Sequence, residues 1–125
     1  MSKIDLSPSK LDLRGVPAGD DIALVIRFKD SDGNPQDTTG ATLAAQVRQS
    51  KTADEIELSA SVSALTDGSD GEWSVLFSGT DTRTLIAGGV SWSGVWDLEV
   101  TLAGQVNPRT VLGGRFQIES DVTRV

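Results

Sequence analysis

The chain contains no cysteine, no histidine and no tyrosine among its 125 residues. Without cysteine it has no disulfide, thiolate metal site or iron–sulfur cluster. Without histidine it lacks the commonest general base near neutral pH, and the ordinary nucleophile–base triads cannot be assembled. No apolar run approaches the roughly 20 residues that span a membrane as a helix. The N-terminus lacks the apolar core of a signal peptide, so we expect synthesis and folding in a cytoplasm.

Basic residues are also scarce, and the chain has a net charge of −7 and a pI of about 4.4. Binding to nucleic acid or to an anionic membrane needs a basic surface, whereas Lys and Arg are scattered along this sequence. We therefore expect neither partner, and we attribute the acidity to solubility. The length suits one domain with its own core.

Strict alternation of apolar and polar residues is the most informative pattern that is present. In Ile56–Ala64 every second residue is apolar, so one face of a strand would be buried and the other would carry Glu57 and three serines. The same period of two recurs over residues 21–29, 41–49, 73–77, 95–102 and 109–119. It predicts that Leu58, Val62, Val75, Leu98 and Phe116 share one core, with Trp73 and Trp96 also facing inward.

Glycine, proline and aspartate separate these segments at short intervals. The density of Gly and Pro over Gly15–Gly19 predicts a loop, and Lys10–Arg14 before it predicts a short edge strand. Thr80–Ala87 has helix capping and stop signals and predicts one or two helical turns that place Leu85 over the end of the domain. Gly113-Gly114 inside the last strand predicts a bulge or a close backbone approach. About seven short strands with regular turns are typical of an antiparallel β-sandwich.

Few residues in this pattern are candidates for chemistry. Asp97 and Glu99 form a carboxylate pair of the kind that hydrolyses glycosides, but they share the solvent face of one predicted strand. No phosphate-binding glycine motif occurs. We therefore predict no catalytic residues, no cofactor and no small-molecule substrate.

The segment from Asp30 to Asn34 resembles the start of a calcium-binding loop. The EF-hand pattern has Gly at its sixth position and Glu at its twelfth, where this chain has Pro35 and Ala41. Asp32-Gly33 is also a strong hairpin-turn signal. A turn without bound metal is the favoured interpretation, and calcium binding is the alternative.

Trp92 is the tryptophan that alternation does not assign to the core, because it falls in a predicted loop from Val90 to Gly94. Three roles are open to this side chain: it folds over the end of the sandwich, it anchors a partner protein, or it contributes to a sugar-binding platform. The sequence favours the first of these roles over the second.

Several short motifs together resemble a family of bacteriophage proteins. They are Gly19-Asp20, Asp30–Thr42, Val47-Arg48, Trp96–Thr101, Arg109–Gly114 and Asp121–Arg124. In this order they are similar to the small immunoglobulin-like structural proteins of tailed phages, such as the N-terminal domain of baseplate upper proteins and minor tail proteins. The resemblance covers roughly residues 10–124, and, unlike the baseplate upper proteins, this chain is expected to have no helical or receptor-binding extension.

The resemblance implies an all-β, immunoglobulin-like sandwich with one short helix, and a role in assembling a virion. We expect an N-terminal arm over residues 1–9, a single domain over residues 10–125, and other virion proteins as partners in the tail, baseplate or neck. A capsid decoration protein and a carbohydrate-binding module are the alternatives. The charged residues of the polar ends, Lys3, Asp5 and Arg124, join Trp92 as candidate partner contacts.

Overall fold

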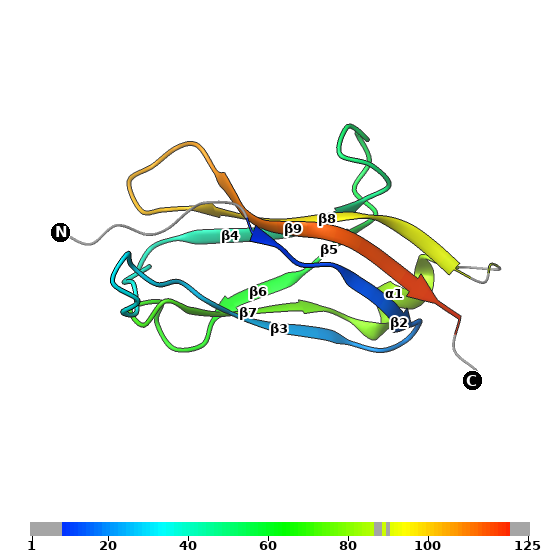
Figure 1. The fold of residues 1–125 in the computed structure, drawn as a ribbon, viewed down its shortest axis with the longest axis horizontal. Helices are drawn as coiled ribbons and strands as arrows, with labels where there is room; N and C mark the ends of the chain where they lie inside the picture. The colour runs from blue at the N-terminus through cyan, green and yellow to red at the C-terminus, as the bar shows by residue number, and fades with distance from the viewer. Residues whose placement is uncertain (1–8, 87–88, 90, 121–125) are drawn as a thin grey trace.

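The computed structural model describes residues 9–86, 89 and 91–120, and the strands in this part of the chain form two stacked sheets (Figure 1). The larger sheet has six strands in the order β1-β9-β8-β4-β5, with β2 also paired to β9. Its strands are β1 (Ser9–Lys10), β2 (Leu13–Pro17), β4 (Thr42–Arg48), β5 (Leu58–Ser59), β8 (Ser91–Thr101) and β9 (Arg109–Glu119). The smaller sheet has three strands in the order β3-β7-β6, namely β3 (Ile22–Arg27), β6 (Ser61–Ala64) and β7 (Glu72–Phe77).

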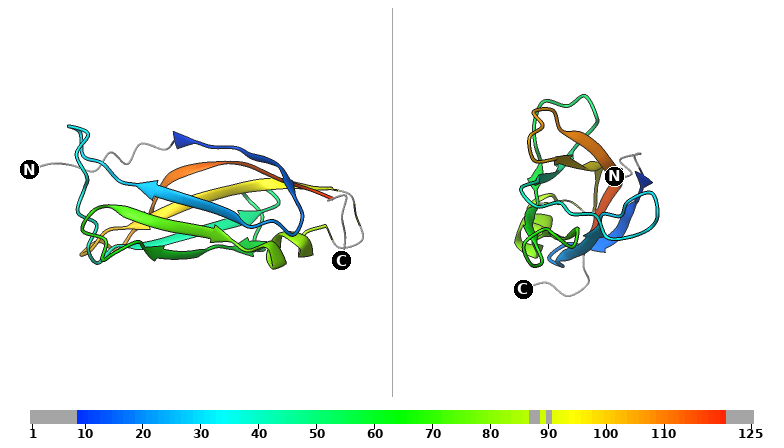
Figure 2. Two further views of the ribbon diagram at one scale, coloured as in Figure 1. Left: turned by 90° about the horizontal axis from the view of Figure 1, so that it is seen from below. Right: turned by 90° about the vertical axis from the view of Figure 1, so that its left-hand side faces the viewer.

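The core fills the space between the sheets, which the end-on view of Figure 2 shows as two facing layers. Alternation puts one face of each strand inward, and the inward residues of β4, β7 and β8 are buried. Phe77 of the smaller sheet makes edge-on contacts with Trp96 and Phe116 of the larger one, at centroid distances of 6.2 and 5.3 Å. The predicted shared core is confirmed: Leu58, Val75, Leu98 and Phe116 are buried, Val62 packs against them, and Trp73 and Trp96 face inward.

The alternating segment Ile56–Ala64 is not one strand, as its pattern predicts, but two. Leu58-Ser59 pairs with β4 of the larger sheet, and Ser61–Ala64 pairs with β7 of the smaller sheet. The chain changes sheet at Ala60, whose N–H still donates to the carbonyl of Ala45 at 2.9 Å. The alternation continues through the change because both sheets face the same core, whereas Ile56 lies before it and is exposed.

The first strand also differs from its prediction. Gly15–Pro17 belongs to β2 rather than to a loop, and β1 and β2 run parallel to β9, so the sandwich is not wholly antiparallel. Proline is tolerated there because β2 lies at the edge of its sheet and ends at Pro17. Ser9, assigned to the N-terminal arm, lies in β1.

The paired glycines of β9 make the predicted close approach. A Cβ on Gly114 would overlap the carbonyl oxygen of Leu11 and lie 2.6 Å from Oδ1 of Asp12. The bulge is nearby but at another residue: the pairing of β9 with β8 shifts between Leu112 and Thr110, which leaves Val111 as the extra residue.

Helix α1 (Gly79–Thr84) overlaps the predicted region Thr80–Ala87 but begins one residue before it, with Ser78 as its N-cap. The Ser78 hydroxyl accepts a hydrogen bond from the N–H of Asp81 at 3.2 Å. Thr82 is fully buried, and its hydroxyl accepts from the N–H of Gly19 at 3.1 Å. Leu85 packs against the core as expected. The helix therefore fastens the β2–β3 connection to one end of the sandwich (Figure 1).

Candidate interface surfaces

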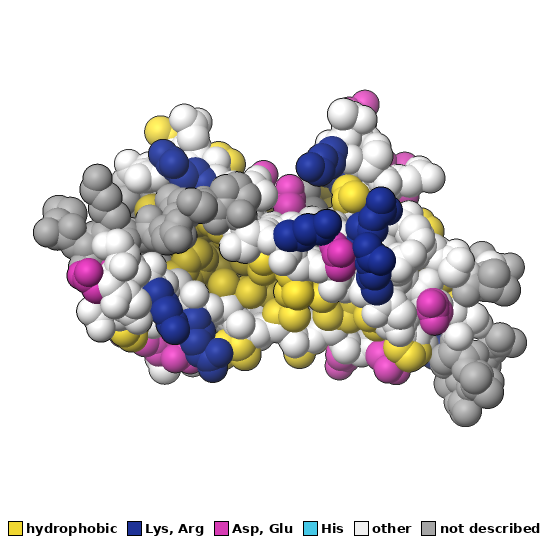
Figure 3. Space-filling model, viewed as in Figure 1, with side chains coloured by type: hydrophobic (Ala, Val, Ile, Leu, Met, Phe, Trp, Pro, Cys, Tyr) yellow, Lys and Arg dark blue, Asp and Glu magenta, His cyan; other side chains and the backbone are white. Residues whose placement is uncertain are grey.

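One side of the sandwich is open between β2 of the larger sheet and β3 of the smaller one. Four inward residues of these two strands are only partly buried although they pack against the core: Leu13, Val16, Leu24 and Ile26. The space-filling view shows hydrophobic side chains gathered along this side, between β2 and β3 (Figure 3). The side is open because the first strand of the chain joins β9 and leaves β3 at the edge of its sheet.

The outer edge of β3 presents unpaired backbone groups. The N–H of Phe28 donates to the carbonyl of Gly71 at 2.9 Å, so the backbone groups of Phe28 point towards β7 as in a hydrogen-bonded pair, although its carbonyl accepts from the N–H of Gln36 at 3.0 Å. In an antiparallel ladder such pairs alternate. With the register of β3 and β7, the backbone groups of Leu24 and Ile26 therefore bond to β7. Those of the alternate residues point to the open edge and have no partner strand in the described part of the chain: Ala23, Val25 and Arg27.

The other edges of the two sheets are better protected. β2 ends in Pro17, which has no N–H, and its pairing with β9 is irregular between Leu13 and Val16. β6 is short, exposes serine side chains, and continues directly into the other sheet through Ala60. β3 has six residues and no proline, and the outward side chain of Val25 is 49% exposed. Charged Arg27 and Lys29 stand at one end of this edge, but the centre of β3 around Val25 lacks the usual features that prevent strand pairing with another chain.

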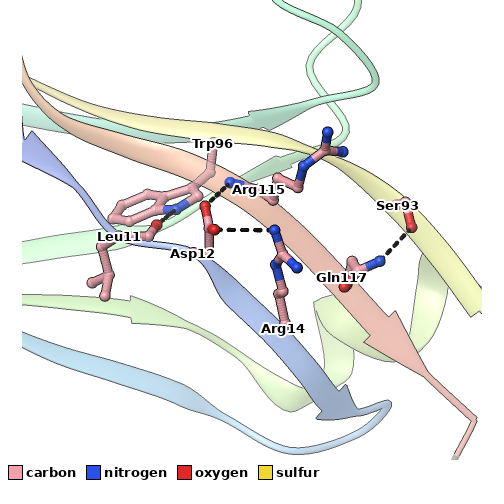
Figure 4. A network of polar contacts seen from close by, with 7 residues as sticks. All are labelled: Leu11, Asp12, Arg14, Ser93, Trp96, Arg115 and Gln117. Carbon is pink, nitrogen blue, oxygen red and sulfur yellow. Dashed lines mark hydrogen bonds and ion pairs between the residues drawn. The ribbon is translucent and has the colours of Figure 1, made fainter.

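A group of polar contacts explains why β1 and β2 lie against β9 and not against β3 (Figure 4). The indole N–H of Trp96 donates to the carbonyl of Leu11 at 2.8 Å, and the N–H of Arg115 donates to Oδ1 of Asp12 at 2.9 Å. That second bond holds the pKa of the Asp12 carboxyl below its ordinary value, and Arg14, 3.1 Å away, acts in the same direction. These contacts hold the link between β1 and β2 over the space that Gly114 leaves.

A second surface is an open groove on the outer face of the larger sheet, beside the loop that joins β4 to β5. Its lining includes four cations and three carboxylates, in a chain that is strongly acidic overall. They are Lys10, Arg48, Lys51 and Arg115, with Asp54, Asp97 and Glu99. Arg48 has a structural role, because its guanidinium donates to the carbonyls of Ala53 and Asp54 at 3.0 and 2.7 Å.

Asp97, one of the two candidate catalytic carboxylates, lies in this groove. Burial raises the pKa of Asp97 above its ordinary value, while the charges of Arg48 and Lys51 lower it. Glu99 follows on the same outer face and is also partly buried. The groove therefore holds mixed charges beside each other, which suits contact with a polar protein surface.

Trp92 lies in strand β8, not in the predicted loop. It pairs with Ile118 of β9, and its ring meets that of Phe116 edge-on with centroids 6.4 Å apart. The ring also covers Gly94, where a Cβ would overlap it. Trp92 is thus half-buried over the end of the core, the first of the roles considered for it, and its role in partner binding stays a prediction. Lys3, Asp5 and Arg124 lie outside the described residues.

The Asp30–Asn34 segment forms a turn in which the aspartate binds backbone groups. Oδ1 of Asp30 accepts from the N–H groups of Asp32 and Asn34 at 2.9 and 3.0 Å. The strands on either side, β3 and β4, belong to different sheets, so the turn does not join a long hairpin. Within residues 9–86, 89 and 91–120, no three metal-binding side chains form a cluster, and no helix could cross a membrane.

The edge of β3 is the feature that the sequence analysis did not single out, although the sequence contains a signal for it. Residues 21–29 keep an apolar residue at every second position, but Ala23 and Val25 are also apolar and occupy the face where polar residues are expected, so Ile22–Ile26 is a continuous apolar run. Continuous runs are typical of strands covered on both faces. In the structure only the inner face of β3 is covered.

The strand order places the chain in the class of immunoglobulin-like β-sandwiches, as the resemblance implies. No protein-family model matches the chain, and no curated protein does. Among solved structures it is similar to the ASH/PapD-like domain 7 of human CEP192, at 12% identity and a TM-score of 0.39, over 98% of this chain and 86% of that one. Neither value is high enough to transfer a function.

Proposed function

We propose that this chain is a structural, protein-binding module of a tailed-phage virion, in the tail, baseplate or neck. The observation that carries the proposal is the unprotected edge of β3, where unpaired backbone groups lie beside partly exposed Leu24 and Ile26. Such an edge forms an interface by accepting a strand from another protein. The motif resemblance supplies the virion context, and the groove on the larger sheet is a second, polar surface for a neighbour.

We propose no catalytic activity for the chain. Histidine, cysteine and tyrosine are missing from the whole sequence. The carboxylates Asp97 and Glu99 lie on an outer face, in a groove with Arg48, whose guanidinium holds the β4–β5 loop. An immunoglobulin-like sandwich with these side chains is better suited to binding than to acid–base chemistry.

Among the alternatives, the use of aromatic side chains disfavours a carbohydrate-binding module. All six aromatic residues fall in the described part of the chain. Five are buried in the core, and Trp92 is half-buried against Phe116. A sugar platform needs an exposed flat ring. A capsid decoration protein uses the same kind of protein contact as a tail protein and stays open as the alternative within the virion.

Mass spectrometry of purified particles tests the virion role directly. We expect peptides of this chain in particles of the phage that encodes it, at a fixed ratio to the major tail protein. Absence of the chain from intact particles, with the chain present in the infected lysate, would overturn the proposal. Cross-linking in the same particles then distinguishes tail, baseplate or neck neighbours from capsid neighbours.

The predicted N-terminal arm has its own test. We expect that deletion of residues 1–8, which stops short of β1, leaves the thermal melt nearly unchanged and lowers incorporation into particles. The polar sequence of these residues predicts little contribution to a core, so we expect the arm to order on a neighbour. Normal incorporation of the shortened chain would remove the arm from the account.

A further inference from the structure

The free edge of β3 has a sequence that complements itself. Its outward backbone groups belong to Ala23, Val25 and Arg27, with Val25 at the centre. In an antiparallel ladder, residues whose groups point to the same edge can face each other as hydrogen-bonded pairs. A second β3 strand, rotated about a two-fold axis through Val25, offers the same groups in the opposite direction.

We propose that the partner of this edge is a second copy of the chain, paired antiparallel through β3 with Val25 opposite Val25 of the second copy. Ala23 then faces Arg27 of the second copy, and each pair exchanges both of its N–H···O bonds. The two smaller sheets become one continuous sheet across the axis. This interface is isologous, which is the commonest arrangement in homo-oligomers. The inference rests on the proposed docking role of the β3 edge and names its partner.

Side chains match on the outer face of the joined sheet. Val25, 49% exposed in the single chain, meets its own copy across a directly opposed pair, which would shield both side chains. Arg27 lies opposite the small side chain of Ala23, so no like charges are opposed in the centre. This contact would explain why Ala23 and Val25 are apolar although they lie on the outer face of β3.

The inner face also matches. In the same register Leu24 faces Ile26 of the second copy, and both are only partly buried at the open side of the single chain. At each end Asp21 falls opposite Lys29 of the second copy, and both are exposed charges of opposite sign. Oδ1 of Asp21 accepts from the N–H of Gly79 at 2.6 Å, which leaves the other carboxylate oxygen for the lysine. The charge pattern therefore favours the antiparallel register centred on Val25.

The absence of cysteine makes a single-cysteine experiment decisive. In Val25→Cys the two thiols would face each other across the axis, with Cα atoms about 5.5 Å apart, within the range of about 4.4–6.8 Å for disulfides. We expect rapid, near-complete formation of a disulfide-linked dimer under mild oxidation. Val106→Cys is the matched control, because Val106 is 91% exposed and lies in the β8–β9 turn of the larger sheet, whereas β3 belongs to the smaller one. Equal, slow cross-linking of the two variants would overturn the proposal.

Analytical ultracentrifugation of the unmodified chain and of Val25→Lys tests the same interface without a cross-link. We expect the mass of the unmodified chain to rise with concentration from 13.2 kDa towards twice that value. The Val25→Lys variant would place two ammonium groups side by side and raise the dimer dissociation constant at least tenfold, whereas Val106→Lys leaves it unchanged. Circular dichroism confirms that each variant is folded.

The outcomes separate this inference from the proposed function. A chain that stays at 13.2 kDa at its highest attainable concentration, yet is present in purified particles, overturns the second copy as partner and leaves the virion role standing. A chain that dimerises through Val25 but is absent from particles supports the second copy as partner and overturns the virion role. A dimer that Val25→Lys does not weaken shows that the copies meet elsewhere, and it also overturns the β3 pairing.

Discussion

The two sheets of this sandwich differ in how completely their strands are covered. In the larger sheet β8 lies between β9 and β4, and its inward residues from Gly94 to Val100 are all buried. In the smaller sheet only the central β7 is covered to that extent, and the inward residues of β3 and β6 are mostly half-buried. The larger sheet thus supplies most of the stable core, and the smaller sheet leaves partly exposed apolar side chains that can contact other molecules.

Charge follows the same division. The strands and connections of the smaller sheet, within residues 18–38 and 60–86, carry nine acidic and three basic side chains. The described remainder carries seven acidic and six basic ones. Nearly all of the net charge of −7 therefore belongs to the smaller sheet and its loops. Along this acidic layer, the centre of β3 is apolar, and Arg27 and Lys29 follow at its end, so the edge differs from its surroundings.

The largest expected contrast comes from the same substitution made in each sheet. Leu98→Ala removes a fully buried side chain of β8, and we expect a loss of about 2–5 kcal/mol in the free energy of unfolding. Leu24→Ala removes a half-buried side chain of β3, and a loss of about 1 kcal/mol is expected. Urea melts of dilute protein measure both values. Equal losses would show that the two sheets share the core more evenly than described.

The second contrast concerns how a tryptophan of each sheet satisfies its buried N–H. Trp96 donates to a backbone carbonyl, whereas Trp73 donates to the hydroxyl of Thr38 at 2.9 Å. Thr38→Val keeps the shape but leaves the Trp73 N–H unpaired, so we expect a loss of about 1–3 kcal/mol. Thr42→Val, at an exposed position of β4, is the control and should stay within about 0.5 kcal/mol. If the Thr38 variant were as stable as its control, the indole N–H of Trp73 would have to bond to water or to another acceptor.

The third prediction tests the attachment of the first strand to the larger sheet. Gly114→Ala would force its methyl group against Leu11 and Asp12, and such overpacking should cost about 1–3 kcal/mol. Gly89→Ala meets only an ordinary contact of 3.5 Å and serves as the control. Melting temperatures of the two variants measure the difference. An unchanged Gly114 variant would mean that β1 and β2 are held less closely to β9.

The smallest expected effect is the pH dependence of the groove. Burial raises the pKa of Asp97, so the native state of the protein favours the protonated carboxyl. The stability that this group contributes is present at low pH and is lost as pH rises through the raised pKa. Asp97→Asn should therefore be slightly more stable than the parent chain at neutral pH, by at most about 0.5 kcal/mol. Thermal melts should show this advantage vanish as pH falls below the usual Asp range. A constant difference across pH would contradict the burial of this carboxyl.

The sequence predicts the strands and core of this protein better than it predicts their assignment to sheets. Alternation identifies which residues face the core, as Val75 and Leu98 show, but it has the same form in either sheet. It therefore did not reveal the change of sheet at Ala60. The density of Gly and Pro likewise hid the parallel pairing of β2, which depends on contacts of Asp12 with a residue far along the chain.

The candidate interface was harder to predict for the same reason. Whether Val25 is exposed depends on which strand lies beside β3, and that is decided by the packing of the first strand around Gly114. The sequence contains the apolar run that marks β3, but only the topology shows that one of its faces and one of its edges lack a partner.

Amide hydrogen exchange along β3 is the most direct test of the claim that this edge pairs with a second copy of the chain. In dilute protein we predict fast exchange for Ala23, Val25 and Arg27 and slow exchange for the alternate amides of Leu24 and Ile26, which bond to β7. In concentrated protein the three fast amides should become protected while the other two change little. Uniform protection along β3 in dilute protein, or fast exchange that persists at high concentration, would contradict the account.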